Sequence, residues 1–235
     1  MSARPPTLDD APAPDYLGHR ARLKERFLTS GPTALADYEL LELLLFLAIP
    51  RRDVRSLAKA LIKRFGGFAA VVDAPAERLK EVAGVGDGVV VALRTARAAA
   101  VHMLRSELAG RPVLGSWQKV IDYLTADMAW QAEEHVRVLY LNQKNVMIAD
   151  ELQHRCTVNQ AAVYPREVAK RALELRASAV ILAHNHPGGD PTPSATDIDL
   201  TRTVRDALKA VGVTLHDHVV VAREGAVSLR NLGKI

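Results

Sequence analysis

The sequence predicts an all-α N-terminal domain followed by an α/β domain whose mixed sheet is flanked by helices. Apolar residues recur at helical spacing from residue 19 to residue 106, and that part of the chain contains no convincing strand. Beyond residue 112, short runs rich in valine, isoleucine and leucine alternate with helical segments. Gly110, Arg111 and Pro112 separate the two patterns, so we expect domains at residues 17–110 and 112–235.

The N-terminal helices follow from periodicity and from breaking residues. Residues 1–16 are rich in proline and aspartate, which predicts a disordered tail. Asp53 is a candidate N-cap and Gly66 a candidate end for the clearest helix. Its apolar stripe has helical spacing and consists of Val54, Leu57, Ala58, Leu61, Ile62 and Phe65. The other helices are expected near residues 19–29, 38–48, 76–82 and 89–106.

The C-terminal part of the chain alternates between segments with strand periodicity and segments with helical periodicity. Asn142 to Asn145 read as a hairpin turn between two strands. The run Ala179 to Ala183 is wholly apolar, which is typical of a buried central strand. Strands are expected at 135–142, 146–151, 157–163, 179–183, 213–215, 219–222 and 226–229. Helices are expected at 116–128, 165–176 and 194–211.

Composition and charge limit the possible functions. The 235 residues are 49% hydrophobic and 25% charged, as in a soluble globular protein. The single cysteine, Cys156, excludes an intrachain disulfide and a zinc site made of several thiolates. The longest apolar run, residues 43–49, is too short to span a bilayer, and no signal peptide is recognisable. We therefore expect a cytoplasmic protein with no membrane partner.

The net charge of +4 lies entirely in the N-terminal half. Residues 1–111 carry 17 lysines and arginines against 13 acidic residues, whereas residues 112–235 carry 14 of each. This asymmetry is compatible with a polyanionic partner, but an ordinary solvated surface explains it equally well.

Two histidines and an aspartate form the pattern most informative about function. His184 and His186 are two residues apart at the end of the apolar strand, so both side chains point to the same side. Asp197 could complete three ligands for a divalent metal and leave the fourth tetrahedral position open to water. Ser194 and Asp197 also have the spacing of a capping box, a structural role that is compatible with ligation.

The pattern His-x-His-x7-Ser-x2-Asp matches the motif of JAMM (MPN+) zinc metalloproteases. The segments HNHPGGDPTPSATDIDLT, PREVAKRAL and HDHVVV, with LADYELLELLLFLAIPRRDVRSLAKALIKRFGG upstream, resemble the RadC family. This resemblance covers residues 18–235. It implies the cytidine deaminase-like JAMM/MPN fold, with His184, His186 and Asp197 as ligands of one zinc ion. It further implies that Ser194 assists at the oxyanion.

The JAMM mechanism also needs a glutamate that activates water, and three candidates precede the histidines. Glu134 opens the strand EHVRVLYLN and fits best, whereas Glu133 should face the other way. Glu167 is the rival, although its expected place in the first turn of a helix is favourable for any acid. Spacing alone leaves the choice between Glu134 and Glu167 open.

Three other residues near this motif have simpler structural explanations. His216 and His218 flank Asp217 and could mimic a second metal pair, but we expect a structural strand end. Cys156 stands where the family usually has glycine, and a buried, inert thiol is the expected outcome.

The segment Val82-Ala-Gly84-Val-Gly86 resembles the hairpin of a helix-hairpin-helix unit. Such glycines let backbone N–H groups approach a DNA phosphate. However, Asp87 follows where a basic residue is often found, and an acid beside a phosphate is unfavourable. DNA contact through residues 17–110 and protein docking therefore both remain open.

The leading hypothesis is a zinc-dependent metallohydrolase, a peptidase or isopeptidase, whose partner is a protein or peptide substrate. Glu134 and Ser194 are its predicted catalytic residues. The alternatives are a DNA-binding accessory protein in repair or recombination, and a metal-dependent nuclease that uses the same ligands. A mononuclear iron site is chemically allowed by two histidines and one carboxylate, but the JAMM spacing argues for zinc.

Overall fold

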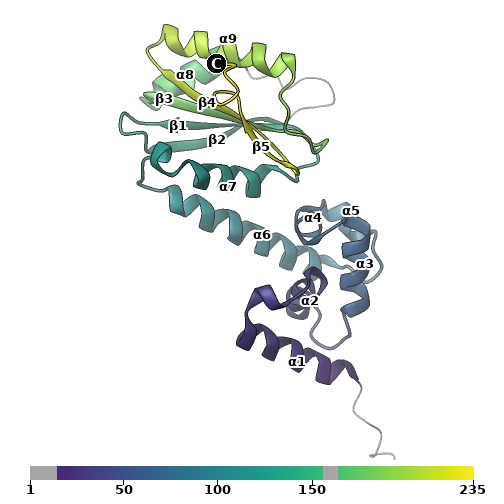
Figure 1. The fold of residues 1–235 in the computed structure, drawn as a ribbon. Coiled ribbons are helices and arrows are strands. Elements are labelled where there is room, and N and C mark those ends of the chain that lie inside the picture. Colours follow the sequence, from purple (N-terminus) through teal and green to yellow (C-terminus); the bar gives the residue numbers. More distant parts are fainter. Residues whose placement is uncertain (1–14, 156–163) are drawn as a thin grey trace, which may run out of the picture. The chain divides into compact units, whose positions relative to one another are not determined.

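The computed structural model describes residues 15–155 and 164–235 (Figure 1). Within these ranges the chain divides into two compact units, one ending at Ala96 and the other formed by Arg97–Ile235. Most of the expected N-terminal tail, the expected strand at 157–163 and Cys156 lie outside the described residues.

The first unit is all-α, as predicted. Its helices enclose one apolar core that includes Leu41, Leu45, Leu61 and Leu79, all with no exposed surface. The elements are α1 (Asp15–Ser30), the 3-10 turn η2 (Pro32–Ala34), α2 (Asp37–Ala48), α3 (Arg55–Phe65), α4 (Phe68–Asp73), α5 (Ala76–Lys80) and the start of α6 (Asp87–Leu108). The short helix α4 was not expected from the sequence, because six residues are too few to show a helical period.

Helix α3 has the predicted end but a different beginning. Val54, not Asp53, occupies the N-cap position. The Asp53 carboxylate still accepts the backbone N–H of Arg55 at 2.9 Å, so it satisfies one of the free donors of the first turn. At the other end, Gly66 adopts φ +96° and donates its N–H to the carbonyl of Ile62, which confirms it as the end of the helix.

Replacing Gly66 with alanine should destabilise the helical unit by about 1 kcal/mol, because a Cβ is unfavourable at positive φ. Gly67 is a matched control, since its φ of 166° is extended backbone that alanine adopts freely. Thermal unfolding followed by circular dichroism should show a clear fall in Tm for Gly66→Ala and little change for Gly67→Ala. Equal effects of the two substitutions would contradict the assignment.

The second unit is built on a five-stranded sheet with the order β2-β1-β3-β4-β5. The sequence predicted a mixed sheet but not this order. Strands β3 and β4 are parallel, and the other neighbouring pairs are antiparallel. The strands are β1 (His135–Leu141), β2 (Met147–Arg155), β3 (Ala179–Asn185), β4 (Thr214–Ala222) and β5 (Gly225–Ser228). The expected strands 213–215 and 219–222 are one strand, because Asp217 and His218 also pair with β3 across a bulge at His216.

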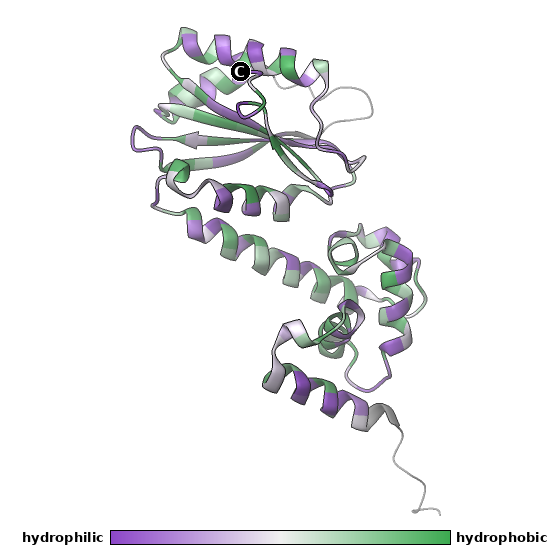
Figure 2. Ribbon diagram, viewed as in Figure 1, coloured by the Kyte–Doolittle hydropathy of each residue, from purple (hydrophilic) through white to green (hydrophobic). Residues whose placement is uncertain are grey.

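Helices cover both faces of this sheet (Figure 1). The α7 helix (Trp117–Met128), preceded by the 3-10 turn η3 (Val113–Ser116), and the end of α6 cover one face. The α8 helix (Pro165–Glu174) and the α9 helix (Ala195–Ala210) cover the other. Every residue of β3 is buried, as expected of a central strand, and hydrophobic residues line the strands and the helix sides that meet them (Figure 2).

Helix α6 contributes to both cores. Val89 and Leu93 belong to the core of the first unit, whereas Leu104 and Leu108 pack with α7 and the sheet. The units therefore divide within α6, whereas the boundary expected at residues 110–112 lies just beyond the end of this helix. None of the helices in residues 15–155 and 164–235 combines the length and the apolar composition needed to cross a bilayer.

An ionic cluster anchors α7 to the sheet just before the segment that carries Glu134. Arg137 on β1 pairs with Asp127 on α7 and with Asp150 on β2, both at 2.5 Å. The hydroxyl of Tyr123 on α7 also donates to Asp150, and burial beside this carboxylate raises the pKa of Tyr123. These contacts hold the end of α7 and the beginning of β1 in place.

Candidate metal centre

Strand β3 delivers both histidines to the face covered by α8 and α9. Val180 and Leu182 pack into the core on that face, and alternation places His184 on the same side, with 2% of its surface exposed. His186 follows the strand, but its N–H still bonds the carbonyl of Val221 on β4 at 2.9 Å. The extended pairing keeps the His186 ring beside the ring of His184, as the sequence predicted.

The capping box of α9 holds Asp197 beside the two rings. Ser194 is the N-cap residue, and its hydroxyl accepts the N–H of Asp197 at 3.2 Å. In return, the Asp197 carboxylate accepts the N–H of Ser194 at 2.7 Å. This arrangement confirms the predicted capping box and fixes the carboxylate at the start of the helix.

The ligand atoms of the triad converge. The Nε2 atoms of His184 and His186 are 3.0 Å apart. Asp197 Oδ1 lies 3.5 Å from Nε2 of His184, and Oδ2 lies 3.4 Å from Nε2 of His186. Ligands about 2.0–2.2 Å from a tetrahedral zinc ion are roughly 3.3–3.6 Å from one another. The three residues therefore fit a divalent metal, and in the described ranges they form the one such group of histidine and acidic residues.

The Nδ1 atoms of both histidines have hydrogen-bonding partners, so the Nε2 atoms remain available to a metal ion. Nδ1 of His186 lies 3.0 Å from the carbonyl oxygen of Asp190, and a carbonyl can only accept. Nδ1 of His184 lies 2.7 Å from Nε2 of His218. Both rings are thereby oriented with Nε2 toward Asp197, which is the arrangement usual for metal-binding histidines.

The electrostatics of the site favour an ionised Asp197 and a neutral His218. Burial raises the pKa of Asp197, but the facing His184 and the donors of Ser194 outweigh it and hold the pKa well below its usual range. Burial lowers the pKa of His218 well below the ordinary value. The triad thus offers one anionic oxygen and two imidazole nitrogens.

Glu134 lies immediately before β1, two residues ahead of Val136, which pairs with His184 of β3. Its predicted role as the base therefore rests on its position in the chain beside this pair of strands, and it stays a prediction. Glu133 has a side chain that is 65% exposed. Glu167 lies in the first turn of α8, is 49% exposed and pairs with Arg166 at 3.2 Å.

Asn185, which the sequence did not single out, clamps the segment that carries Glu134. Its Oδ1 accepts the N–H of His135 at 2.7 Å, and its Nδ2 donates to the carbonyls of Glu133 at 3.0 Å and Gln131 at 3.4 Å. The residue is completely buried. The middle residue of His-Asn-His therefore joins β3 to the backbone on both sides of Glu134.

The three residues of the HDH segment, His216 to His218, have different roles. Two make structural contacts, and one contacts the triad. Asp217 accepts bonds from Ser228 and from the N–H of Arg230, which is a structural role, but it lies within β4 and not at the strand end that was expected. His216 bonds Asn145 at 2.6 Å, away from the triad. His218, in contrast, contacts His184 of the triad, which the expectation of a purely structural pair missed. Only the pairing of β3 with β4 brings His218 to this place.

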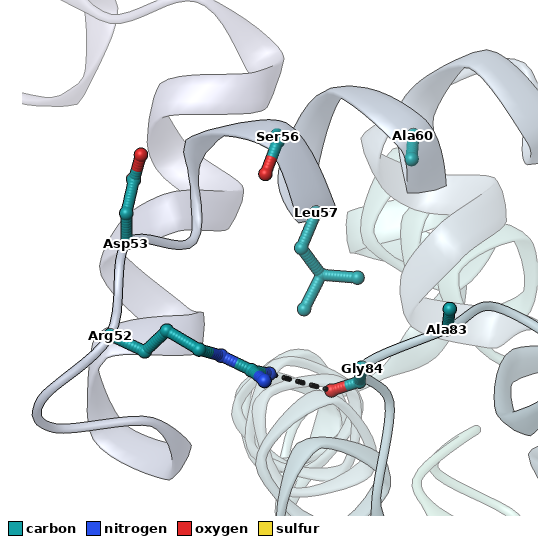
Figure 3. Close-up of a pocket in the computed structure, with 7 residues that line it drawn as sticks. All are labelled: Arg52, Asp53, Ser56, Leu57, Ala60, Ala83 and Gly84. Carbon is teal, nitrogen blue, oxygen red and sulfur yellow. Dashed lines mark hydrogen bonds between the residues drawn. The ribbon is translucent and has the colours of Figure 1, made fainter.

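The glycine hairpin of the first unit lies between α5 and α6, as expected. Gly84 adopts φ +95°, and a Cβ there would be 3.2 Å from the Arg52 guanidinium. Arg52 donates to the Gly84 carbonyl at 3.4 Å across a pocket that is shown in Figure 3. Asp87 at the start of α6 pairs with Lys80 at 2.6 Å, and this hydrogen bond lowers the pKa of Asp87.

The mixed sheet, its flanking helices and a triad at the end of a buried strand define a JAB-like domain. A family model described as "RadC-like JAB domain" matches residues 114–234, and one described as "UPF0758 N-terminal" matches residues 16–91. A UPF0758 protein of Ruegeria pomeroyi is 53% identical over 221 residues, which are 94% of this chain and 99% of that protein. The chain belongs to this family of UPF0758 proteins with a RadC-like JAB domain, which confirms the resemblance noted in the sequence.

Proposed function

We propose that the second unit is a zinc-dependent hydrolase that cleaves amide bonds, either as a peptidase or as an isopeptidase. The convergence of the His184, His186 and Asp197 ligand atoms at 3.0–3.5 Å carries the proposal. Two imidazoles and one carboxylate suit zinc, and three protein ligands leave one position for water. When bound, zinc lowers the pKa of its water toward ~7 and polarises a carbonyl.

The side chains around the triad supply the remaining functions in this proposal. Glu134 takes the proton from the attacking water and passes it to the leaving amine. Ser194 donates its hydroxyl to the developing oxyanion. In the structure this hydroxyl donates to Asp197 Oδ2 at 2.7 Å, so it must turn toward the substrate, while the Ser194 N–H continues to hold the carboxylate.

Metal content tests the proposal without knowledge of the substrate. We expect the purified protein to bind one equivalent of zinc and His186→Ala to lose it. Zinc should also raise the Tm, since an ion that binds only the folded state stabilises it by about 2.7 kcal/mol at 100 times its Kd. His216→Ala is the matched control, because His216 lies on β4 but outside the triad.

Elemental analysis and thermal unfolding with and without a chelator give both readouts. A wild-type protein that remains metal-free in excess zinc, with an unchanged Tm, would refute the proposal. Equal zinc binding by wild type and His186→Ala would place the metal elsewhere.

DNA binding through residues 17–110 has less support. The hairpin presents the carboxylate of Asp87, held ionised by Lys80, at the beginning of α6. An acid at that point is unfavourable beside a phosphate, and the nearby cation of Lys80 is already paired with it.

A further inference from the structure

The Nδ1 atom of His184, on the side of the ring away from Asp197, contacts a residue of the neighbouring strand. His218 lies on β4 opposite Leu182 of β3, so its side chain is on the same face of the sheet as His184. Its Nε2 lies 2.7 Å from Nδ1 of His184, and the His218 ring is 2% exposed. No water competes for a contact that is buried to this degree.

The chain of contacts continues to the third ligand. Nδ1 of His218 lies 2.5 Å from the hydroxyl of Thr201 on α9. Thr201 has no exposed surface. Thr201 donates in turn to the backbone carbonyl of Asp197, one turn earlier in the helix. The contacts therefore run from the ring of one ligand to the backbone of another.

The backbone carbonyl of Asp197, at the end of this chain of contacts, sets the direction of each hydrogen bond in it. A carbonyl only accepts, so the one hydroxyl proton of Thr201 goes to Asp197. The Thr201 oxygen is then the acceptor for an N–H at Nδ1 of His218, which leaves Nε2 of His218 as an acceptor. His184 must consequently carry its proton on Nδ1, and its Nε2 has a free lone pair facing Asp197.

We propose that His218 and Thr201 are positioning residues that hold His184 in the tautomer and orientation required for metal binding. This inference rests on the metal site of the proposed function. Loss of a hydrogen-bonding partner behind a ligand typically weakens metal binding 10- to 100-fold. We therefore expect His218→Leu and Thr201→Val to raise the Kd for zinc by about 10- to 100-fold.

Conservative variants separate positioning from a general loss of structure. Thr201→Ser keeps the hydroxyl and should bind zinc as wild type does, whereas the isosteric Thr201→Val should not. His218→Gln keeps an acceptor for His184 and should recover most of the affinity lost in His218→Leu. His216→Leu is the control for a histidine of the same strand that bonds Asn145 and not a ligand.

The measurements are zinc affinity by competition with a chelating indicator, and the His184 tautomer by ¹H–¹⁵N NMR of the metal-free protein. We expect the Nδ1–H form in wild type and its loss in His218→Leu. Zinc affinities of His218→Leu and Thr201→Val that equal that of His216→Leu would overturn the inference while leaving the metal site intact. A wild-type protein that binds no zinc would refute the proposed function. Separately, finding the Nε2–H tautomer of His184 in the metal-free wild type would overturn the inference.

Discussion

Replacing Glu134 with glutamine should lower the rate of amide hydrolysis by about 10²- to 10⁴-fold, the usual contribution of a general base. Glutamine has nearly the same shape but cannot take a proton from water. Because Glu134 is not one of the three converging ligands, the variant should still bind one equivalent of metal. The substitution thus separates proton transfer from metal binding.

Glu167→Gln is the matched control. Glu167 is an acid on the same domain, but its side chain is half exposed and pairs with Arg166 on its own helix. Its replacement should change the rate by less than about twofold, since losing an exposed ion pair alters little. Internally quenched peptides and an ε-linked isopeptide can serve as substrates. A large loss in Glu167→Gln with full activity in Glu134→Gln would reverse the assignment of the base.

Replacing Asn185 with aspartate should reduce the free energy of unfolding of the second unit by about 3 kcal/mol near neutral pH. The change keeps the acceptor for the N–H of His135 but removes both donors. A carboxylate would then face the carbonyls of Gln131 and Glu133 in a buried position. An unpaired, buried charge of this kind is strongly unfavourable.

The destabilisation should depend on pH in a definite direction. Burial against two carbonyls raises the pKa of the new carboxyl group above its value of about 3.9 in the unfolded chain. The folded variant therefore binds its proton more tightly, and the deficit relative to wild type should shrink as the pH falls toward 4. A deficit that grows on acidification would contradict this account.

Asn142→Asp is the control for the same chemical change. Asn142 uses only its oxygen, which accepts the N–H groups of Lys144 and Val146 in the β1–β2 turn. Aspartate preserves both bonds, so the expected change is below about 0.5 kcal/mol. Urea unfolding of the two variants measures the difference, and equal losses would show that the donors of Asn185 do not matter.

The local features of the candidate site could be predicted from neighbouring residues. His184 and His186 share a side because a strand alternates faces, and the apolar run before them indicated that the strand is buried. The capping box of Ser194 and Asp197 could be read from a spacing of three residues. In each case the physical cause acts within one turn or one strand. The Asp53 N-cap was wrong by one residue because helix ends depend on backbone angles that spacing does not report.

The sequence by itself therefore determined the fold class and the three candidate ligands. Only the tertiary structure decided what supports them. Asn185 clamps a segment about 50 residues away, and His218 reaches His184 across 34 residues. Both contacts follow from the antiparallel register of β1 on β3 and the parallel register of β4 on β3. Strand register arises from packing of the whole sheet, which is why these roles have no signature in local spacing.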